Sequence, residues 1–185
     1  MLSKSSAASP QGPHGGASAV DAACERASRL IEARAPRHEI LGCLVAAAER
    51  VAGPRAAVSI LVLDLQGLLR NGASPNLPPD YLDAIDRLAP DPAVGTCAAA
   101  AATGSVVVTP SFLADDKWNE LRHLPLSIGY VGAWSMPIKS PRSGRVLGTF
   151  GTYYRDERQP TEDEVAAVTT LAAVAARALE RAPSA

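Results

Sequence analysis

The sequence predicts an α/β (α+β) fold in which helices cover both faces of a central antiparallel sheet. Three observations support this prediction. The segment 130–154 resembles two strands joined by a turn: residues 145–154 are rich in Val, Thr, Phe and Tyr, which favour strands, and Pro141 and Gly144 provide the turn. The segment 57–65 is almost continuously apolar, as expected for a strand that is buried on both faces. Apolar residues at helical spacing occur near both ends of the chain.

The first half of the chain is predicted to hold three helices and one strand pair. Residues 1–19 are mainly Ser, Ala, Gly and Pro, which cannot bury enough apolar surface to offset ordering, so a flexible tail is expected. Helical spacing follows over 20–34 and resumes after Pro36, which breaks the pattern. The remaining elements expected here are the helix 38–51, the strands 57–65 and 68–73, and a short helix over 79–88.

The second half is predicted to contain the central hairpin and the last helix. Strand alternation over 131–139 places Trp134, Met136 and Ile138 on one face. Thr161 and Glu164 form a capping box that marks the start of the last helix. The other expected elements are a helix in the alanine run 98–102, a strand over 106–109, a helix over 118–126 and the second hairpin strand over 145–154. One domain, 20–182, precedes a short tail at 183–185.

Composition excludes several classes of partner. The chain has 185 residues, a formal net charge of -1 and no basic cluster, so neither nucleic acid nor an acidic membrane surface is expected to bind. No apolar run approaches the roughly 18 residues of a membrane span, and no secretory signal is visible, which predicts a cytoplasmic protein. The three cysteines lie far apart and suggest neither a disulfide framework nor a metal site.

Several motifs resemble the GAF domain family, in particular bacterial sensory GAF domains. They are Trp134-Ser135-x-Pro137-Ile138, the run 146–150, the pattern 153–164, and the earlier segments 72–81 and 95–97. The resemblance covers roughly 27–181. It implies a five- or six-stranded antiparallel sheet with helices on both faces, and N- and C-terminal helices packed together on one of them. GAF domains sense small molecules and other signals, and are usually connected to a separate output domain.

The resemblance implies a non-catalytic sensor. An unidentified small molecule, or a change in redox state, would act between the sheet and the segment 109–129. The terminal helices would then pass the signal to a separate output protein or to an effector domain outside this sequence. The alanine-rich last helix is either a homodimer contact or internal packing, and a ligand-free dimerisation module is a further alternative.

Eight residues are candidates for lining the ligand pocket. Aromatic and apolar side chains supply most of the contact area in such pockets, although core packing alone would explain the same residues. Some GAF domains hold haem through a histidine, but a single histidine without a partner motif favours a surface position. The sequence therefore identifies no cofactor. The candidates are Cys97, Phe112, Asp115, Trp118, His123, Tyr130, Trp134 and Met136.

Cys97 also raises an enzymatic alternative. A thiol at the start of a helix can have a lowered pKa, which would suit a redox sensor or a catalytic thiol like that of the GAF-fold reductases of free methionine sulfoxide. Those enzymes need a further cysteine in the pocket, and residues 130–133 contain none. Cys24 and Cys43 belong to the covering helices. A small, buried structural thiol is therefore the favoured interpretation of Cys97.

Overall fold

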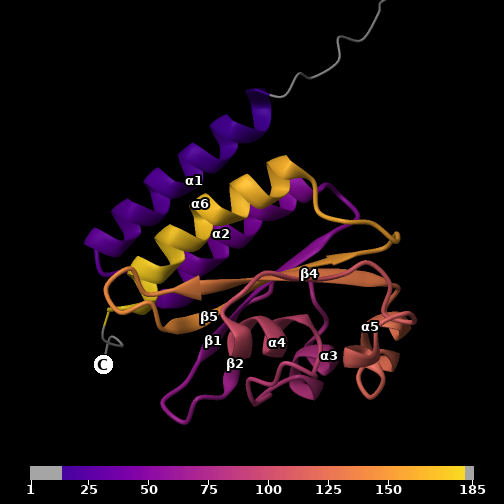
Figure 1. Ribbon diagram of the computed structural model, residues 1–185. Helices are drawn as coiled ribbons and strands as arrows, with labels where there is room; N and C mark the ends of the chain where they lie inside the picture. Colours follow the sequence, from indigo (N-terminus) through magenta and orange to yellow (C-terminus); the bar gives the residue numbers. More distant parts are fainter. Residues whose placement is uncertain (1–13, 182–185) are drawn as a thin grey trace, which may run out of the picture.

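The computed structural model describes residues 14–181, which fold as one antiparallel sheet between two helical layers (Figure 1). The strand order is β2-β1-β5-β4-β3, so the sheet is five-stranded. The predicted hairpin forms its middle, because β5 pairs with β1 on one side and with β4 on the other. The strands are β1 (Ala57–Leu63), β2 (Leu69–Ala73), β3 (Val107–Thr109), β4 (Gly132–Lys139) and β5 (Val146–Tyr154).

The two helical layers differ in size and in chain position. The terminal-helix layer packs on one face and consists of α1 (His14–Glu32), α2 (Arg37–Ala52) and α6 (Glu162–Leu179). The second layer comes from the middle of the chain and covers the opposite face. It consists of α3 (Pro79–Ala84), α4 (Thr96–Thr103), the 3-10 helix η1 (Asp116–Trp118) and α5 (His123–Ser127).

Most predicted elements agree with the structure to within about two residues at each end, and the larger differences occur in three places. Of the expected tail 1–19, residues 1–13 lie outside the described residues, but α1 already begins at His14 because extending a helix costs less than nucleating one. The expected helix 118–126 is split into η1 and α5, since Pro125 has no N–H to continue the hydrogen-bond ladder. The chain leaves α3 early, and Arg87 adopts a positive φ of 65°. The tail 183–185 also lies outside the described residues.

A buried hydrogen-bond network ties the sheet to the terminal-helix layer. Trp134 Nε1 donates to the Tyr154 hydroxyl at 2.8 Å, and this hydroxyl donates to Glu164 Oε1 at 2.9 Å. Arg158 donates to both oxygens of Glu164 and lies 3.6 Å above the Tyr154 ring. Glu164 also completes the predicted capping box with Thr161. The start of α6 is therefore fixed to β4 and β5 by side chains as well as by apolar packing.

The small residues of α6 are used inside the domain. This helix packs against α1, α2 and β4, and most of its alanines are buried. Alanine allows such close approach because its side chain ends at Cβ. Internal packing therefore accounts for the composition of the last helix. Within 14–181, no helix combines the length and apolar character needed to cross a membrane.

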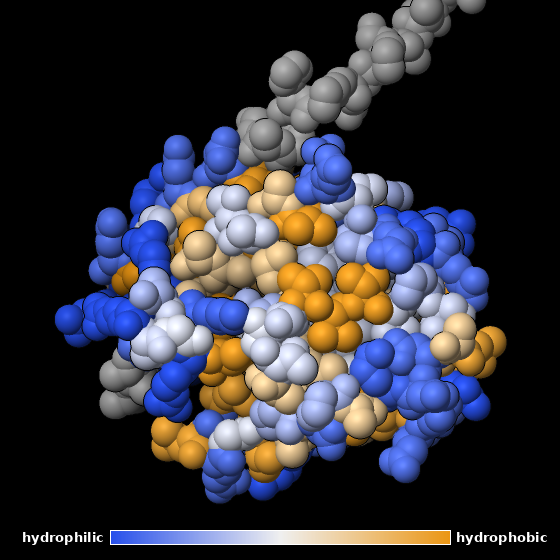
Figure 2. Space-filling model, in the orientation of Figure 1, coloured by the Kyte–Doolittle hydropathy of each residue, from blue (hydrophilic) through white to orange (hydrophobic). Residues whose placement is uncertain are grey.

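One edge of the sheet is covered only in part. The short strand β3 pairs with β4 over three positions, from Ala133 to Ser135. Pro137 therefore lies where β4 no longer has a β3 neighbour, a position that suits a residue without an N–H. Figure 2 shows apolar side chains across the middle of the view and charged ones mostly around its rim. Val106, directly before β3, is one of the few exposed large apolar residues in the described part of the chain.

Candidate functional site

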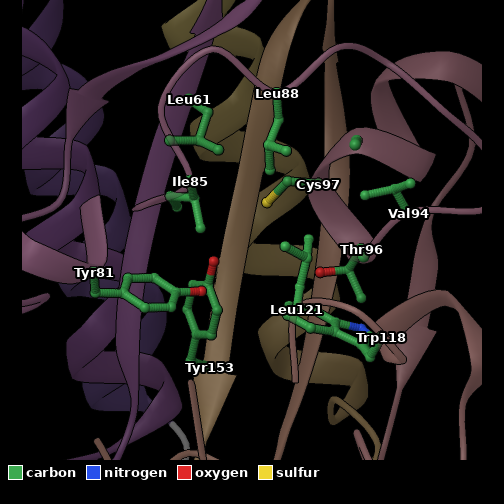
Figure 3. Close-up of a pocket in the computed structure, with 12 residues that line it drawn as sticks. Leu61, Tyr81, Ile85, Leu88, Val94, Thr96, Cys97, Trp118, Leu121 and Tyr153 are labelled. Carbon is green, nitrogen blue, oxygen red and sulfur yellow. The ribbon is translucent and has the colours of Figure 1, made fainter. Parts of the chain in front are cut away.

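A small pocket lies on the sheet face opposite the terminal helices. The strands β1 and β5 form its floor, and α3, α4 and the turn that follows η1 form its walls (Figure 3). Its free volume is about 20 Å³, which is enough for roughly one water molecule. Apart from the thiol of Cys97, the side chains around it are aliphatic, aromatic or hydroxyl-bearing. The lining residues are Leu61, Tyr81, Ile85, Leu88, Val94, Gly95, Thr96, Cys97, Ala98, Trp118, Leu121 and Tyr153.

Cys97 lies above a polar spot on the sheet. Its Sγ is 3.1 Å from Ser135 Oγ, and Ser135 Oγ donates to Thr96 Oγ1 at 2.9 Å. The register brings Ser59 of β1 and Ser135 of β4 beside Gly151 of β5. A Cβ atom at position 151 would lie only 2.9 Å from Cys97 Sγ, so the close approach of the thiol requires glycine there.

The surroundings of Cys97 favour the protonated thiol over the thiolate. Burial raises the pKa of Cys97, and the hydrogen bond with Ser135 only partly opposes this effect. The position at the start of α4 therefore does not lower the pKa as the redox hypothesis requires. Cys24 and Cys43 pack in the terminal-helix layer, on the other side of the sheet. No second cysteine of the chain accompanies Cys97 in the pocket.

Two tyrosines complete the pocket wall beside Cys97. Tyr81 of α3 and Tyr153 of β5 meet edge to face, with ring centroids 5.8 Å apart, and their hydroxyl groups lie close together (Figure 3). Burial raises the pKa of both phenols, and the neighbouring Cys97 adds to this effect. Both hydroxyls therefore remain neutral and keep their protons at physiological pH.

Trp118 brings an unsatisfied polar group into this region. Its side chain is only 4% exposed, and its Nε1 has no hydrogen-bond partner. Leaving a buried donor unpaired costs about 1–3 kcal/mol. Ser59 Oγ and Thr149 Oγ1 are also buried without a partner, but neither residue lines the pocket. Trp118 is thus the one pocket residue of the described chain with a buried, unpaired side-chain donor.

Four of the eight predicted residues lie in or directly behind the pocket. Cys97 and Trp118 line it. Phe112 packs against Trp118 with ring centroids 4.2 Å apart, and Tyr130 packs against Tyr153 at 5.8 Å. Phe112 and Tyr130 belong to the same apolar cluster but do not reach the free space.

The other four predicted residues lie elsewhere. Trp134 and Met136 face the terminal helices, so the expectation that they line the pocket is corrected: alternation turns their neighbour Ser135 toward it instead. Asp115 accepts from Lys117 N and so caps η1, and it also accepts from Thr109 Oγ1 at 2.6 Å. Although burial opposes the effect, hydrogen bonds from Lys117 and Thr109 lower the pKa of Asp115.

His123 begins α5 and is exposed, as its favoured interpretation predicts. It is therefore not held in the pocket. Within residues 14–181, no three or more His, Cys, Asp or Glu side chains gather in a way that would hold a metal ion.

The sequence reasoning missed several pocket residues, among them Tyr81, Thr96 and Tyr153. A signal existed for Tyr153, because alternation along β5 places it on the same face as Gly151. Tyr81 belongs to the apolar stripe of α3, and such a stripe predicts ordinary core packing. Their meeting depends on which loop covers which face, and no local pattern encodes that.

Comparisons with known proteins agree with this architecture. The family model described as "GAF domain" matches residues 34–180. A methyl sulfide methyltransferase-associated sensor from Methanosarcina acetivorans is 33% identical over 156 residues, which make up 84% of this chain and 15% of that protein. The chain therefore spans only a small part of the length of this relative.

Solved structures share the fold at lower sequence identity. The free methionine-R-sulfoxide reductase from Neisseria meningitidis, in complex with its substrate, matches with a TM-score of 0.71 and 17% identity, covering 97% of this chain and 96% of that one. The GAF domain of a phosphoenolpyruvate-protein phosphotransferase from Coxiella burnetii matches with a TM-score of 0.66 and 18% identity, covering 87% and 93%. At such identities these matches establish the fold alone.

Proposed function

The chain belongs to the GAF domain family, and from this premise we propose that it is a non-catalytic sensing module. A small molecule enters the pocket between the sheet and the second helical layer. Its binding changes the position of the terminal helices, which pass the change to a partner. The partner is a separate output protein, an effector domain outside this sequence, or a second copy of the chain. The relative named as a sensor supports this class of function.

The unpaired Nε1 of Trp118 is the observation that carries the proposal. A core filled only for stability gains nothing from a buried donor without an acceptor, whereas a ligand would supply the missing partner. The free volume of about 20 Å³ is too small for most metabolites, so Trp118 and Leu121 have to move outward when a ligand enters. The open pocket is then a minor conformation of the free protein, and ligand binding makes this conformation dominant.

Two adjacent residues of β5 offer a route from the pocket to the partner. Tyr153 lines the pocket, and Tyr154 points to the opposite face, where its hydroxyl donates to Glu164 of α6. A ligand that displaces Tyr153 therefore acts on the strand that holds the start of α6. The shift follows only if the ligand binds one arrangement more tightly than the other.

The enzymatic alternative is the reduction of free methionine sulfoxide through Cys97. The shared fold of a reductase of this substrate and the presence of one thiol in the pocket favour testing it. The raised pKa of Cys97 and the location of Cys24 and Cys43 across the sheet argue against it. We expect no turnover of free methionine sulfoxide in the presence of a thiol reductant. Turnover that is lost in Cys97→Ser would replace the sensor proposal by the reductase.

Native mass spectrometry of the protein purified from its own host tests the sensor proposal. We expect a retained small molecule, seen as added mass that is lost on denaturation. Leu121→Trp fills the pocket and should abolish the added mass. Leu124→Trp is the matched control, because Leu124 is also half-buried in this segment but does not line the pocket. Equal retention by Leu121→Trp would exclude this pocket as the binding site.

A further inference from the structure

The pocket that the proposed function uses has no charged side chain in its lining. Its residues are apolar, aromatic, hydroxyl-bearing or, in Cys97, a neutral thiol. In the covering segment, Asp115 and Lys117 lie close to Trp118 in the sequence and pair with each other at 2.8 Å. A ligand with a full charge would therefore lose its hydration and meet no counter-ion in the pocket, and isolated buried charges are strongly disfavoured.

Several polar groups at the pocket can donate a hydrogen bond to a ligand. The Cys97 thiol lies next to Ser135 Oγ, and Ser135 Oγ donates to Thr96 Oγ1. The Thr96 oxygen accepts this bond and points toward the middle of the lining residues in Figure 3, where its hydroxyl can donate to a ligand. The unpaired Nε1 of Trp118 is a donor that cannot accept.

The start of α4 adds to the donor character. Its N-cap is Gly95, no side chain caps it, and Gly95 itself donates to Lys117 O at 2.8 Å. The first N–H groups of a helix lack partners within the helix, and together they carry roughly half of an elementary positive charge. This favours the negative end of a dipole, but it does not neutralise a full anion.

On the basis of the proposed function, we propose that the pocket binds an uncharged, largely apolar molecule that carries a hydrogen-bond acceptor. The acceptor meets Trp118 Nε1 and the Thr96 hydroxyl. The apolar part lies against Leu61, Ile85 and Tyr153. Ligands with a phosphate or carboxylate group bind more weakly than neutral molecules of the same shape.

The indole N–H resonances of the two tryptophans provide the test. Trp118 and Trp134 give two signals in a ¹H–¹⁵N correlation spectrum, and Trp118→Phe and Trp134→Phe assign them. Three probes with the same skeleton are titrated: acetophenone, benzoate as its anionic counterpart, and α-methylstyrene, which lacks the acceptor. Acetone and its anionic counterpart acetate are also titrated, because these smaller probes fit a pocket that opens only slightly.

We expect acetophenone or acetone to shift the Trp118 signal at concentrations at least tenfold below those needed for benzoate or acetate. α-Methylstyrene should bind without moving this signal downfield, because it offers no acceptor. Trp134 is the internal control, since its Nε1 is already bonded to Tyr154 on the other face. Trp118→Phe should weaken the binding of acetophenone more than the binding of α-methylstyrene.

The two proposals fail in different ways. Anionic probes that bind as tightly as the neutral ones would overturn the ligand class and leave the sensor pocket in place. Equal weakening of acetophenone and α-methylstyrene by Trp118→Phe would overturn the role of the indole donor. If none of the probes gives a saturable shift, the pocket does not open, and the proposed function is contradicted together with the ligand class.

Discussion

At the scale of single residues, Gly151 determines how closely α4 can approach the sheet. A Cβ atom there would lie 2.9 Å from Cys97 Sγ and 3.0 Å from Ser59 Oγ. Both neighbours are buried and belong to short side chains, so they cannot swing away. The close contact between Cys97 and Ser135 therefore requires that position 151 of β5 has no Cβ atom.

Gly151→Ala should reduce the free energy of unfolding by about 1–3 kcal/mol, as overpacking does in closely packed cores. Urea denaturation measures this change. The matched control is Gly42→Ala in α2, where a Cβ would have no atom within 4 Å, and there we expect a gain of about 0.5–1 kcal/mol. Removing Sγ in Cys97→Ala/Gly151→Ala should cost less than the sum of the two single changes. Full additivity would show that the thiol is not the obstacle.

Protonation of Glu164 should make the stability of the domain depend on pH. Burial alone would raise its pKa, but hydrogen bonds from Arg158, the Thr161 N–H and Tyr154 hold the pKa below its ordinary value. A carboxylate whose pKa is lowered by folding stabilises the native state above its unfolded pKa of about 4.3. This contribution disappears as the pH falls through the lower, folded pKa.

Glu164→Gln should therefore cost about 1–3 kcal/mol of unfolding free energy at pH 7, because it removes a buried, charge-assisted set of hydrogen bonds. The difference from the wild type should shrink as the pH is lowered below about 4. Glu162→Gln is the control in the same turn, since Glu162 is exposed, and it should change stability by less than about 0.5 kcal/mol. A Glu164→Gln penalty that is constant down to pH 3 would contradict the proposed protonation linkage.

At the scale of elements, local sequence patterns predicted where helices and strands begin and which residues share a face. They did not predict which elements pack together. The capping box at Thr161 and Glu164 identified the start of α6, and alternation identified the common face of Trp134 and Met136. What alternation does not reveal is which helices cover that face. Trp134 and Met136 were expected in the pocket as aromatic and apolar residues, whereas the pocket lies on the opposite face, which carries Ser135 and Gly151. Membership of the pocket depends on the register of three strands and on the path of residues 110–129.

The covering segment around η1 should open more easily than the rest of the domain. It holds only one 3-10 turn and the short α5, and few long hydrogen-bond ladders fix it. Hydrogen exchange of the indole groups measures this opening. We expect Trp118 Nε1–H to exchange at least tenfold faster than Trp134 Nε1–H, which is bonded within the terminal-helix core. Exchange of both groups only through global unfolding would favour the ligand-free module.

At the scale of the whole molecule, the sheet separates two cores and also connects them. Tyr153 belongs to the pocket core and Tyr154 to the terminal-helix core, although they are neighbours in sequence. The hydrogen bonds of Tyr154 link β5 to β4 through Trp134 and to α6 through Glu164. Arg158 extends the link to the end of α2 by donating to Ala52 O at 3.3 Å.

Occupation of the pocket should therefore change the dynamics of α6. With acetophenone bound, we expect backbone amide exchange in the first turn of α6 to change at least about threefold. Tyr154→Phe should keep probe binding but largely remove this response, because the links to Trp134 and Glu164 are lost. Thr170→Ala is the control, since Thr170 bonds only to Ala166 O within the helix. An undiminished response in Tyr154→Phe would show that the coupling takes another route.

The partly covered edge of β4 is a place where two copies of the molecule could pair through their strands. Beyond Ser135 this strand has lost its β3 neighbour, and an open backbone is a template on which another chain can add a strand. Pro137 interrupts that template because it has no N–H to offer, and the exposed Lys139 places a charge at its end. The same few residues that finish the sheet therefore disfavour the pairing of β4 with a strand of another molecule.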